Sequence, residues 1–388
     1  MKIHFLVYNI FGMGGTGRTV LNVANYLAEK NYDVEIISVF KRQAQGFFEI
    51  DPRIKVTVLH DTVTRNSKGK DVKTKVANQF LKLPSLAIHY QDEAYRTFRL
   101  LTDIKIISYI KKINSGILIT TRPSFNLLAV KYANKGVTLV GQEHLNIDIY
   151  PKRLKKSMLK NYAKLDYLLT LTDDDTVEYT RSFEGKSVEV RKITNSIPKL
   201  ESMVSNLEEK TIMAAGRLVE QKGFDLLIES FNYIKDEFPD WRVKIFGFGR
   251  DKKMLEALIQ QYHLYNNVIL MGPTKNIEKE LAKSSIYALS SRFEGFGMVI
   301  VEAMQCGVPV VSYDCPKGPS EIINNNVDGI LVDNGNVKEF AEKLALLMRD
   351  KNLREQIAKE GLISVKRFEI DQIGLEWEKL FEDIQAHT

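Results

Sequence analysis

Short apolar runs alternate with helical runs twice along this 388-residue chain, and the alternation restarts near residue 200. Strand-like runs at residues 3–10 and 34–39 enclose a stretch with apolar residues at helical spacing, and those at 212–215 and 242–246 enclose another. Such alternation predicts parallel sheets with helices on both faces. We therefore expect an α/β chain made of two doubly wound, Rossmann-like domains.

A polar segment without apolar rhythm begins at residue 198 and divides the two series. It predicts a first domain over residues 1–197, a second over residues 198–369, and a separate C-terminal helix within residues 370–388. One stretch interrupts the first series: residues 62–83 are rich in lysine, and we expect a loop or an exposed helix there.

The most informative stretch, residues 290–307, reads SSRFEGFGMVIVEAMQCG and lies between two strand-like runs. We expect Gly297 to open its helix and Gly307 to end it. The free N–H groups of a helix start favour phosphate, and carboxylates such as Glu294 and Glu302 accept hydrogen bonds from hydroxyl groups. Together these groups suit a nucleotide sugar. The alternative is a solvated loop acid at Glu294 and an ordinary helical acid at Glu302.

Two cations, Arg217 and Lys222, follow the strand-like run at residues 212–215 across a turn that starts at Gly216. If this loop curls back, both side chains can reach one site and neutralise a diphosphate. The alternative is a pair of solvated basic residues on a loop.

A glycine turn after the first strand-like run raises a rival interpretation. Gly12, Gly14 and Gly17 fit the turn of dinucleotide-binding proteins, which would make the chain an oxidoreductase. That fingerprint requires an acidic residue after the second strand, where this chain has Lys41 and Arg42. The match to a nicotinamide-binding site is therefore weak.

Three other polar positions allow two interpretations each. His144 follows the strand-like run at residues 137–141, at the end where open α/β sheets bind ligands, yet it could equally be a core or surface histidine. Asn195, at the domain junction, is similarly ambiguous. The three Asp at residues 173–175 could bind a metal, but between a strand and a helix we expect them to cap the helix.

Charge is distributed unevenly along the chain. Residues 1–199 hold 32 Lys and Arg against 19 Asp and Glu, a balance of +13, whereas residues 200–388 balance at −7. An excess of this sign predicts an anionic partner, but no nucleic-acid-binding module accompanies it. A predicted helix at residues 151–165 could lie on an anionic membrane surface or be an ordinary solvated face. Its candidate contact residues are Lys152, Arg153, Lys155, Lys156 and Lys160.

The number of cysteines and the length of the apolar runs indicate the cellular compartment in which we expect the protein. The two cysteines, Cys306 and Cys315, are too few for a disulfide framework. No run approaches the eighteen or so apolar residues that a spanning helix needs, and the first apolar run is too short for a signal peptide. We therefore expect a cytoplasmic protein, with possible peripheral contact at the inner face of the membrane.

Together these motifs resemble the GT-B glycosyltransferases, and specifically glycosyltransferase family 4, over nearly the whole chain. The most specific part is SRFEGFGMVIVEAMQCGVPVV, which contains Glu294 and Glu302 and is followed by DCPKGPSEII. GRLVEQKGF, TNSIP and GMGGTGR support the resemblance. It implies two domains that face a central cleft and a last helix that crosses back to the first domain.

The resemblance also implies a reaction and its residues. The family transfers a sugar from a nucleotide donor with retention of configuration, without a metal or other cofactor. By position, Arg217 and Lys222 would hold the donor diphosphate, Glu294 the sugar hydroxyls and Glu302 the ribose hydroxyls, while His144 would lie near the transferred sugar. The remaining implied donor contacts are Gly14, Gly15, Gly216, Gly295, Phe296, Gly297, Met298 and Val299.

The resemblance also suggests which donor and which acceptor the enzyme uses. DCPKGPSEII is similar to bacterial enzymes that use UDP-hexoses or UDP-N-acetylhexosamines in surface polysaccharide and teichoic-acid assembly. We expect a UDP-sugar donor and an anionic acceptor, either a lipid-linked glycan or a polyol-phosphate polymer. Two alternatives stay open: a non-catalytic nucleotide-sugar-binding protein and a nicotinamide-dependent oxidoreductase.

Overall fold

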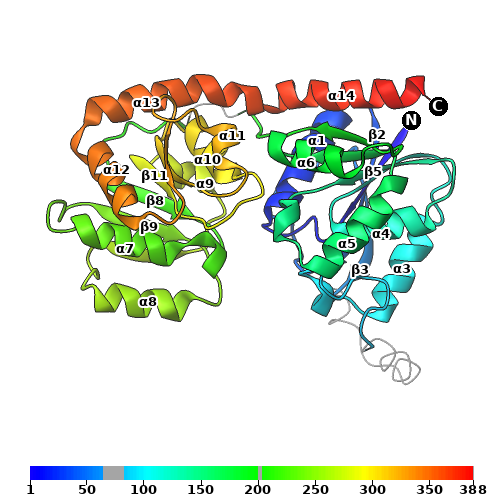
Figure 1. Cartoon of the computed structure of the whole chain (residues 1–388), viewed down its shortest axis with the longest axis horizontal. Helices are drawn as coiled ribbons and strands as arrows, with labels where there is room; N and C mark the ends of the chain where they lie inside the picture. Colours follow the sequence, from blue (N-terminus) through cyan, green and yellow to red (C-terminus); the bar gives the residue numbers. More distant parts are fainter. Residues whose placement is uncertain (64–82, 200–202, 388) are drawn as a thin grey trace. The chain divides into compact units, whose positions relative to one another are not determined.

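The computed structural model describes residues 1–63, 83–199 and 203–387, which form two compact units (Figure 1). Unit 1 comprises Met1–Ser196 together with Ile370–Thr388, and unit 2 comprises Ile197–Glu369. The lysine-rich stretch expected at residues 62–83 lies outside the described residues except at its two ends.

Unit 1 is built on a seven-stranded sheet in the order β3-β2-β1-β4-β5-β6-β7. All of its strand pairs are parallel. The order reverses direction between β1 and β4, which is the position where open α/β sheets bind ligands. The strands are β1 Lys2–Val7, β2 Asp33–Lys41, β3 Lys55–Asp61, β4 Gly116–Thr120, β5 Val137–Gln142, β6 Tyr167–Thr170 and β7 Glu189–Lys192.

Helices cover both faces of this sheet with separate apolar clusters. One cluster joins α1 (Gly15–Glu29) and the last helix, α14 (Ile370–Ala386), to the sheet through buried side chains that include Trp377. The other cluster holds α3 Leu100–Ile110, α4 Pro123–Tyr132, α5 Lys152–Asn161 and α6 Asp173–Ser182. The chain's last helix thus completes the core of the unit that its first residues begin.

The start of α6 differs from the expectation for residues 173–175. The helix is capped by Thr172, whose side-chain oxygen accepts a hydrogen bond from the Asp175 backbone N–H. The three Asp residues instead occupy the first turn, where their charge complements the helix dipole. The hydroxyl of Thr172 sits one residue before the helix and therefore has the cap geometry that the carboxylates lack.

Unit 2 repeats the pattern with a six-stranded parallel sheet in the order β10-β9-β8-β11-β12-β13. Its order reverses between β8 and β11. The strands are β8 Thr211–Ala215, β9 Arg242–Phe246, β10 Val268–Gly272, β11 Ile286–Leu289, β12 Val310–Asp314 and β13 Ile330–Asp333. Both sheets confirm the predicted pair of Rossmann-like domains.

The helices of unit 2 also form two layers (Figure 1). One apolar cluster contains α7 Phe224–Ile234, α8 Lys252–Gln261 and α12 Val337–Arg349. On the other face, α10 (Met298–Gln305) packs against β11 and β12. Beside α10 lie α9 Ile277–Leu281, α11 Pro319–Ile322 and α13 Lys351–Ser364.

The boundaries of α10 are the predicted ones. Gly297 is the residue before its first turn. After the last turn, the Gly307 N–H donates to the Met304 carbonyl and the Val308 N–H donates to the Ala303 carbonyl. These two hydrogen bonds form a Schellman motif, which ends a helix at a glycine.

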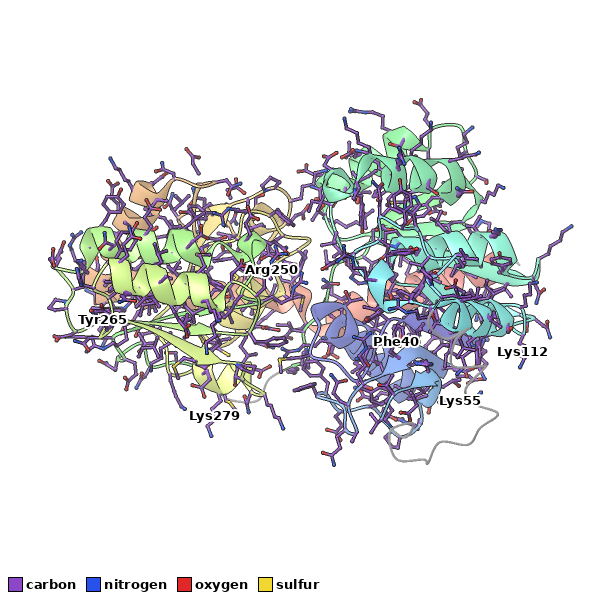
Figure 2. All side chains as sticks on the ribbon, turned by 90° about the horizontal axis from the view of Figure 1, so that it is seen from below. Phe40, Lys55, Lys112, Arg250, Tyr265 and Lys279 are labelled. Atoms are coloured by element: carbon purple, nitrogen blue, oxygen red, sulfur yellow. The ribbon has the colours of Figure 1, made fainter. Side chains whose placement is uncertain are left out.

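In unit 1, a buried carboxylate near the amino ends of the strands joins four elements. Glu35 on β2 is 2% exposed and accepts hydrogen bonds from the Tyr109 hydroxyl (2.5 Å) and the Thr57 hydroxyl (2.7 Å). Lys55, which lies at the margin of the unit (Figure 2), places its Nζ 2.9 Å from the same carboxylate, and His4 Nδ1 lies 3.2 Å away. Burial by itself raises the pKa of Glu35, but the hydrogen bonds from Tyr109, Thr57 and Lys55 together lower it to about 2.

Glu35 makes unit 1 sensitive to acid. Because its pKa is lowered in the folded state, its contribution is complete above the unfolded value and is lost as the pH falls from about 4.3 towards 2. A shift of this size corresponds to about 3 kcal/mol in the free energy of unfolding. Urea unfolding between pH 2 and 6, followed by Trp377 fluorescence in a Trp241→Phe background, should show this loss.

Glu35→Gln should remove most of the pH dependence in that window. The matched control is Glu49→Gln at an exposed position of the same unit, which should leave the dependence intact. Parallel pH curves for Glu35→Gln and the parent would show that Glu35 has no such role.

Candidate active site

The predicted donor-site residues lie at the carboxyl edge of the unit 2 sheet. β8 ends at Ala215 and is followed by Gly216 and Arg217, while the neighbouring β11 ends at Leu289 and is followed by the loop that carries Glu294. These two strands flank the point where the strand order reverses. The residues therefore meet where doubly wound sheets bind their ligands.

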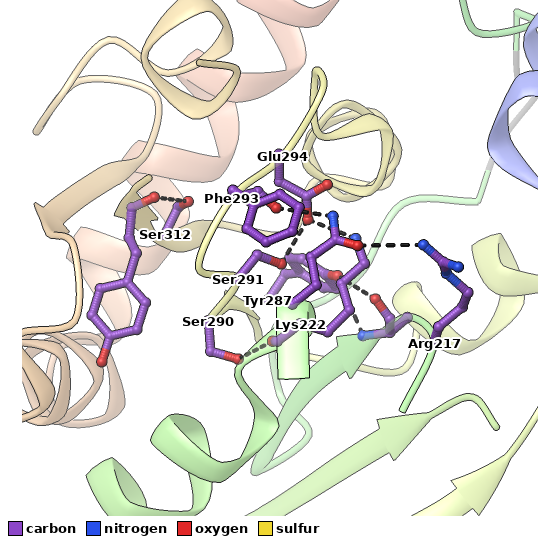
Figure 3. Close-up of polar contacts among 11 residues, drawn as sticks. Arg217, Lys222, Tyr287, Ser290, Ser291, Phe293, Glu294 and Ser312 are labelled. Carbon is purple, nitrogen blue, oxygen red and sulfur yellow. Dashed lines mark hydrogen bonds and ion pairs between the residues drawn. The ribbon is translucent and has the colours of Figure 1, made fainter. Parts of the chain in front are cut away.

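Lys222 and Glu294 form a direct ion pair, with Lys222 Nζ 2.6 Å from Glu294 Oε1 (Figure 3). The Ser291 hydroxyl donates to the same oxygen at 2.6 Å. The Glu294 side chain is 8% exposed and the Lys222 side chain 17% exposed, so the pair is shielded from bulk water. The ammonium compensates a carboxylate that would be costly to bury alone.

The loop that carries Lys222 is tied to the loop that carries Glu294. The Ser290 hydroxyl donates to the Lys222 carbonyl at 3.0 Å. Gly223, with φ of +58°, approaches Ser290 so closely that a Cβ there would lie 1.9 Å from its carbonyl oxygen. Gly216 makes room for the Lys222 side chain, whose methylene groups lie 3.1–3.2 Å from where a Gly216 Cβ would be. Small residues on both loops thus set the position of the ammonium.

Arg217 reaches the site through a neutral bridge. Its Nη2 donates to Gln221 Oε1 at 3.3 Å, and Gln221 Nε2 donates to the Phe293 carbonyl at 3.1 Å (Figure 3). Gln221 therefore connects Arg217 to the residue before Glu294. Lys222 and Arg217 are thus both linked to the loop that carries Glu294, Lys222 directly and Arg217 through Gln221.

The start of α10 and Glu302 complete the set. Gly295, Phe296 and Gly297 are buried directly before the helix, and the N-cap residue, Gly297, has no side chain with which to cap its start. Met298 and Val299 form its first turn.

Glu302 lies one turn further along α10 and is 4% exposed. Burial raises the pKa of the Tyr287 hydroxyl, and the nearby charges of Glu294 and Glu302 raise it further. The two glutamates are thus close to one buried hydroxyl on β11.

The candidates in unit 1 lie at the carboxyl edge of its own sheet. Gly14 and Gly15 are exposed at the start of α1. His144 follows β5, and burial lowers the pKa of its imidazole to about 4, so the ring is neutral at neutral pH. Asn195 is 5% exposed, and its Oδ1 has no hydrogen-bond partner within the described residues.

The basic helix α5 is only partly what the sequence predicted. Lys152, Arg153, Lys156 and Lys160 are exposed. Lys155 instead pairs with Asp148 at 2.8 Å and Glu178 at 3.4 Å.

The apolar face of α5 is not available to a membrane. Leu154 and Met158 are 1% and 0% exposed and belong to the core of unit 1. Insertion of an apolar helix face, one way for a basic amphipathic helix to bind a membrane, is therefore excluded for α5; only its charges face outward.

Three residues of these sites were not predicted from the sequence: Ser291, Gln221 and Glu143. Ser291 stands three positions before Glu294, and this spacing, which lets a hydroxyl reach a carboxylate within one turn, is a signal present in the sequence. Gln221 carries no charge and gave no signal. Glu143 stands beside His144 in GQEHLN, but its surroundings come from elements far apart in the sequence.

No three His, Cys, Asp or Glu side chains within residues 1–63, 83–199 and 203–387 are grouped so that they could hold a metal ion. None of the helices in those ranges is long and apolar enough to cross a membrane.

The two Rossmann-like domains have the GT-B fold, and comparisons with known proteins identify the family of the second domain. The family model "Glycosyl transferases group 1" matches residues 198–362. An exopolysaccharide phosphotransferase from Streptomyces coelicolor is 33% identical over 99% of the chain, which spans 41% of that longer protein. A Campylobacter jejuni N-acetylgalactosaminyltransferase that acts on a diphospho-undecaprenol-linked sugar is 26% identical over 95% of the chain and 96% of its own length.

Solved structures show the same fold. The S. aureus TarM mutant in complex with fondaparinux, alpha-GlcNAc-glycerol and UDP has a TM-score of 0.79 at 18% identity, covering 98% of this chain and 99% of that one. Residues 198–362 thus match a group 1 glycosyltransferase domain. These comparisons give no support to a nicotinamide-dependent oxidoreductase.

Removing the ammonium of Lys222 should destabilise unit 2. In Lys222→Met, Glu294 keeps its buried position with Ser291 but loses its cation, which should lower the free energy of unfolding by about 3 kcal/mol. Adding Glu294→Gln to that variant should restore part of the loss, because no unpaired charge remains. Urea unfolding followed by Trp241 fluorescence in a Trp377→Phe background measures unit 2 alone.

Lys279→Met, at an exposed lysine of the same unit (Figure 2), is the control and should change little. Equal urea midpoints for Lys222→Met and Lys279→Met would show that the ion pair does not stabilise the site.

Proposed function

We propose that this enzyme moves a hexose or N-acetylhexosamine from a UDP-sugar to an anionic or lipid-linked glycan or polyol-phosphate acceptor, with retention of anomeric configuration and without a metal. The product would be part of a bacterial cell-surface polymer. The observation that carries the proposal is the arrangement of Lys222, Glu294 and Arg217 where the strand order of unit 2 reverses. A UDP complex of the structurally similar TarM and the acceptor of the C. jejuni relative support the choice of substrates.

The cations would act on the leaving group. As the bond between the anomeric carbon and the phosphate oxygen breaks, negative charge grows on the diphosphate, and fixed cations stabilise it. Lys222 and Arg217 would supply this charge, together with the N–H groups at the start of α10. A diphosphate would compete with Glu294 for the Lys222 ammonium, and the freed carboxylate could then accept hydrogen bonds from sugar hydroxyls. Glu302 would accept those of the ribose.

We assign no separate nucleophile for a two-step reaction among the site residues that the structure describes, so the substrate would supply part of the chemistry. The acceptor oxygen would bond to the anomeric carbon on the face that the phosphate leaves. Its proton would pass to the departing phosphate oxygen. The two-carboxylate scheme of glycosidases is therefore not the template, although two glutamates are present. Their roles would be recognition.

The acceptor is proposed from the charge of the first half. The excess of +13 over residues 1–199 and the exposed basic residues of α5 suit a polymer or lipid head that carries phosphate. Such acceptors are assembled at the inner face of the cell membrane, so we propose a cytoplasmic enzyme with peripheral contact through charge.

A donor screen tests the proposal directly. UDP-, GDP- and ADP-sugars are compared by thermal shift, and the best binder is used in a hydrolysis assay in which NMR identifies the anomer formed. We expect stabilisation by UDP-sugars, release of UDP with retained configuration, and equal rates with and without EDTA. Stabilisation by NADH that UDP cannot reverse, or an inverted product, would contradict the proposal.

The two glutamates should fail in different ways. Glu302→Gln should weaken binding of UDP, because it would lose hydrogen bonds to the ribose, with little change in turnover once the donor is saturating. Glu294→Gln should mainly lower kcat, because the sugar would lose its orientation at the reacting carbon. Calorimetry with UDP and saturation kinetics with the UDP-sugar separate the two effects, and the reverse pattern would disprove this division of roles.

Charge on α5 should control binding to anionic surfaces. Co-sedimentation with liposomes that contain phosphatidylglycerol should be strong at low salt and weaken steeply as salt rises. The triple variant Lys152→Glu, Lys156→Glu and Lys160→Glu should abolish it. A control triple at exposed lysines of the same unit, Lys112→Glu, Lys135→Glu and Lys186→Glu, should retain more binding. No binding by the parent even at low salt would indicate a soluble acceptor.

A further inference from the structure

A buried acid stands directly beside His144 and has no part in the mechanism above. Glu143 follows the last residue of β5 and is 2% exposed. A carboxylate at such a position requires several hydrogen-bond donors to remain charged. Glu143 has them.

Three side chains from three separate segments donate to this carboxylate. Oε1 accepts hydrogen bonds from the Tyr162 hydroxyl at 2.5 Å and from Asn126 Nδ2 at 2.8 Å, and Oε2 accepts one from the Tyr150 hydroxyl at 2.6 Å. Asn126 lies on α4, and its own Oδ1 accepts a hydrogen bond from Thr120 at 2.5 Å. Tyr162 follows α5. The Oε1 side of the carboxylate is therefore anchored to the helices of the domain.

The Oε2 side is anchored to the loop that carries His144. Tyr150 lies seven residues after Glu143, so their hydrogen bond closes residues 143–150 into a loop. Inside the loop, Asn146 Oδ1 accepts from the Asp148 N–H at 2.7 Å, and Lys155 of α5 holds Asp148 at 2.8 Å. The Glu143 N–H donates to the Leu169 carbonyl on β6.

His144 depends on this loop for its position. Its Nε2 is buried and has no hydrogen-bond partner within the part of the chain that the structure describes. The ring is neutral, so ion pairing does not orient it either.

We propose that Glu143 is a positioning residue whose hydrogen-bonded carboxyl group holds the 143–150 loop, and with it His144, in the geometry needed for sugar transfer. The inference rests on the proposed function for the role of His144. It adds a residue that the sequence motifs do not assign.

Both charge forms of Glu143 can keep this network. A carboxylate accepts from all three donors, whereas a protonated carboxyl group turns one oxygen into a donor, from which the hydroxyl of Tyr150 or Tyr162 can accept. Burial raises the pKa of Glu143 to about 7, although the hydrogen bonds from Tyr150, Tyr162 and Asn126 oppose the rise. Other charged or titratable groups around this cluster are Arg122, Asp148, Asp175, Glu178 and Tyr179. Because this pKa is higher in the folded loop than in solvated chain, the folded loop takes up the proton more readily, and protonation as the pH falls through about 7 favours the folded loop.

Three conservative variants test the proposal. Glu143→Gln removes the charge at nearly constant shape, and Tyr150→Phe removes only the link to the loop. Both should lower kcat by about ten- to hundredfold, because small displacements of groups at the reacting centre are costly. The affinity for UDP should stay within about twofold, because the proposed donor cations lie in unit 2. Tyr162→Phe is the matched control: it removes a helix-side donor, leaves the Tyr150 link in place and should retain most activity.

Two further measurements separate positioning from general stability. The parent's kcat should change across about pH 7, where Glu143 changes its charge, and Glu143→Gln should lack this change. The imidazole ¹⁵N resonances of His144, assigned with His144→Gln, should shift or broaden in Glu143→Gln and Tyr150→Phe but not in Tyr162→Phe.

Unchanged kcat, pH profile and His144 resonances in both Glu143→Gln and Tyr150→Phe would overturn the inference. A parent enzyme that binds no nucleotide sugar would overturn the proposed function instead, and the NMR comparison would still decide whether Glu143 positions His144.

Discussion

Parallel strand pairing is the constraint on which the rest of the structure depends. In each unit every paired strand runs in the same direction, so all carboxyl ends reach one edge of the sheet. Helices cover both faces and leave that edge as the place where loops gather. Lys222 and Glu294 lie 72 positions apart in the chain yet meet there as an ion pair. In unit 1, the loops that carry His144 and Asn195 begin at the carboxyl ends of β5 and β7.

Three buried carboxylates show how surroundings decide what an acid can do. Glu35 has two lysines and two hydroxyls around it, and its pKa falls to about 2, so it is a fixed structural anion. Glu143 is surrounded mainly by neutral donors, and its pKa rises to about 7. Glu294 shares its charge with one ammonium, which in the proposed reaction would turn to the diphosphate of the donor. The same type of side chain is thus a permanently charged structural group at Glu35, a group that changes its charge near neutral pH at Glu143, and one half of an ion pair at Glu294.

Much of the fold could be predicted because the periodicity of apolar residues is local. The strand expected at residues 242–246 matches β9 residue for residue, and α10 starts and ends at the predicted glycines. Expectations failed where a choice depended on a few ångströms or on packing. Thr172 rather than an Asp caps α6. For α5, where two interpretations stayed open, packing decided that Leu154 and Met158 are core residues of their own domain.

By itself the sequence determined the two α/β domains, the donor-site motifs and the excess of positive charge in the first half, because each is written in neighbouring residues. Only the tertiary structure decided that Lys222 pairs with Glu294, that Gln221 links Arg217 to the same loop, and that Glu143 receives hydrogen bonds from three separate segments. Strand order and helix packing bring those residues together. The pattern of neighbouring residues in the sequence does not show which distant side chains will be in contact. The chemistry of each carboxylate follows from those neighbours.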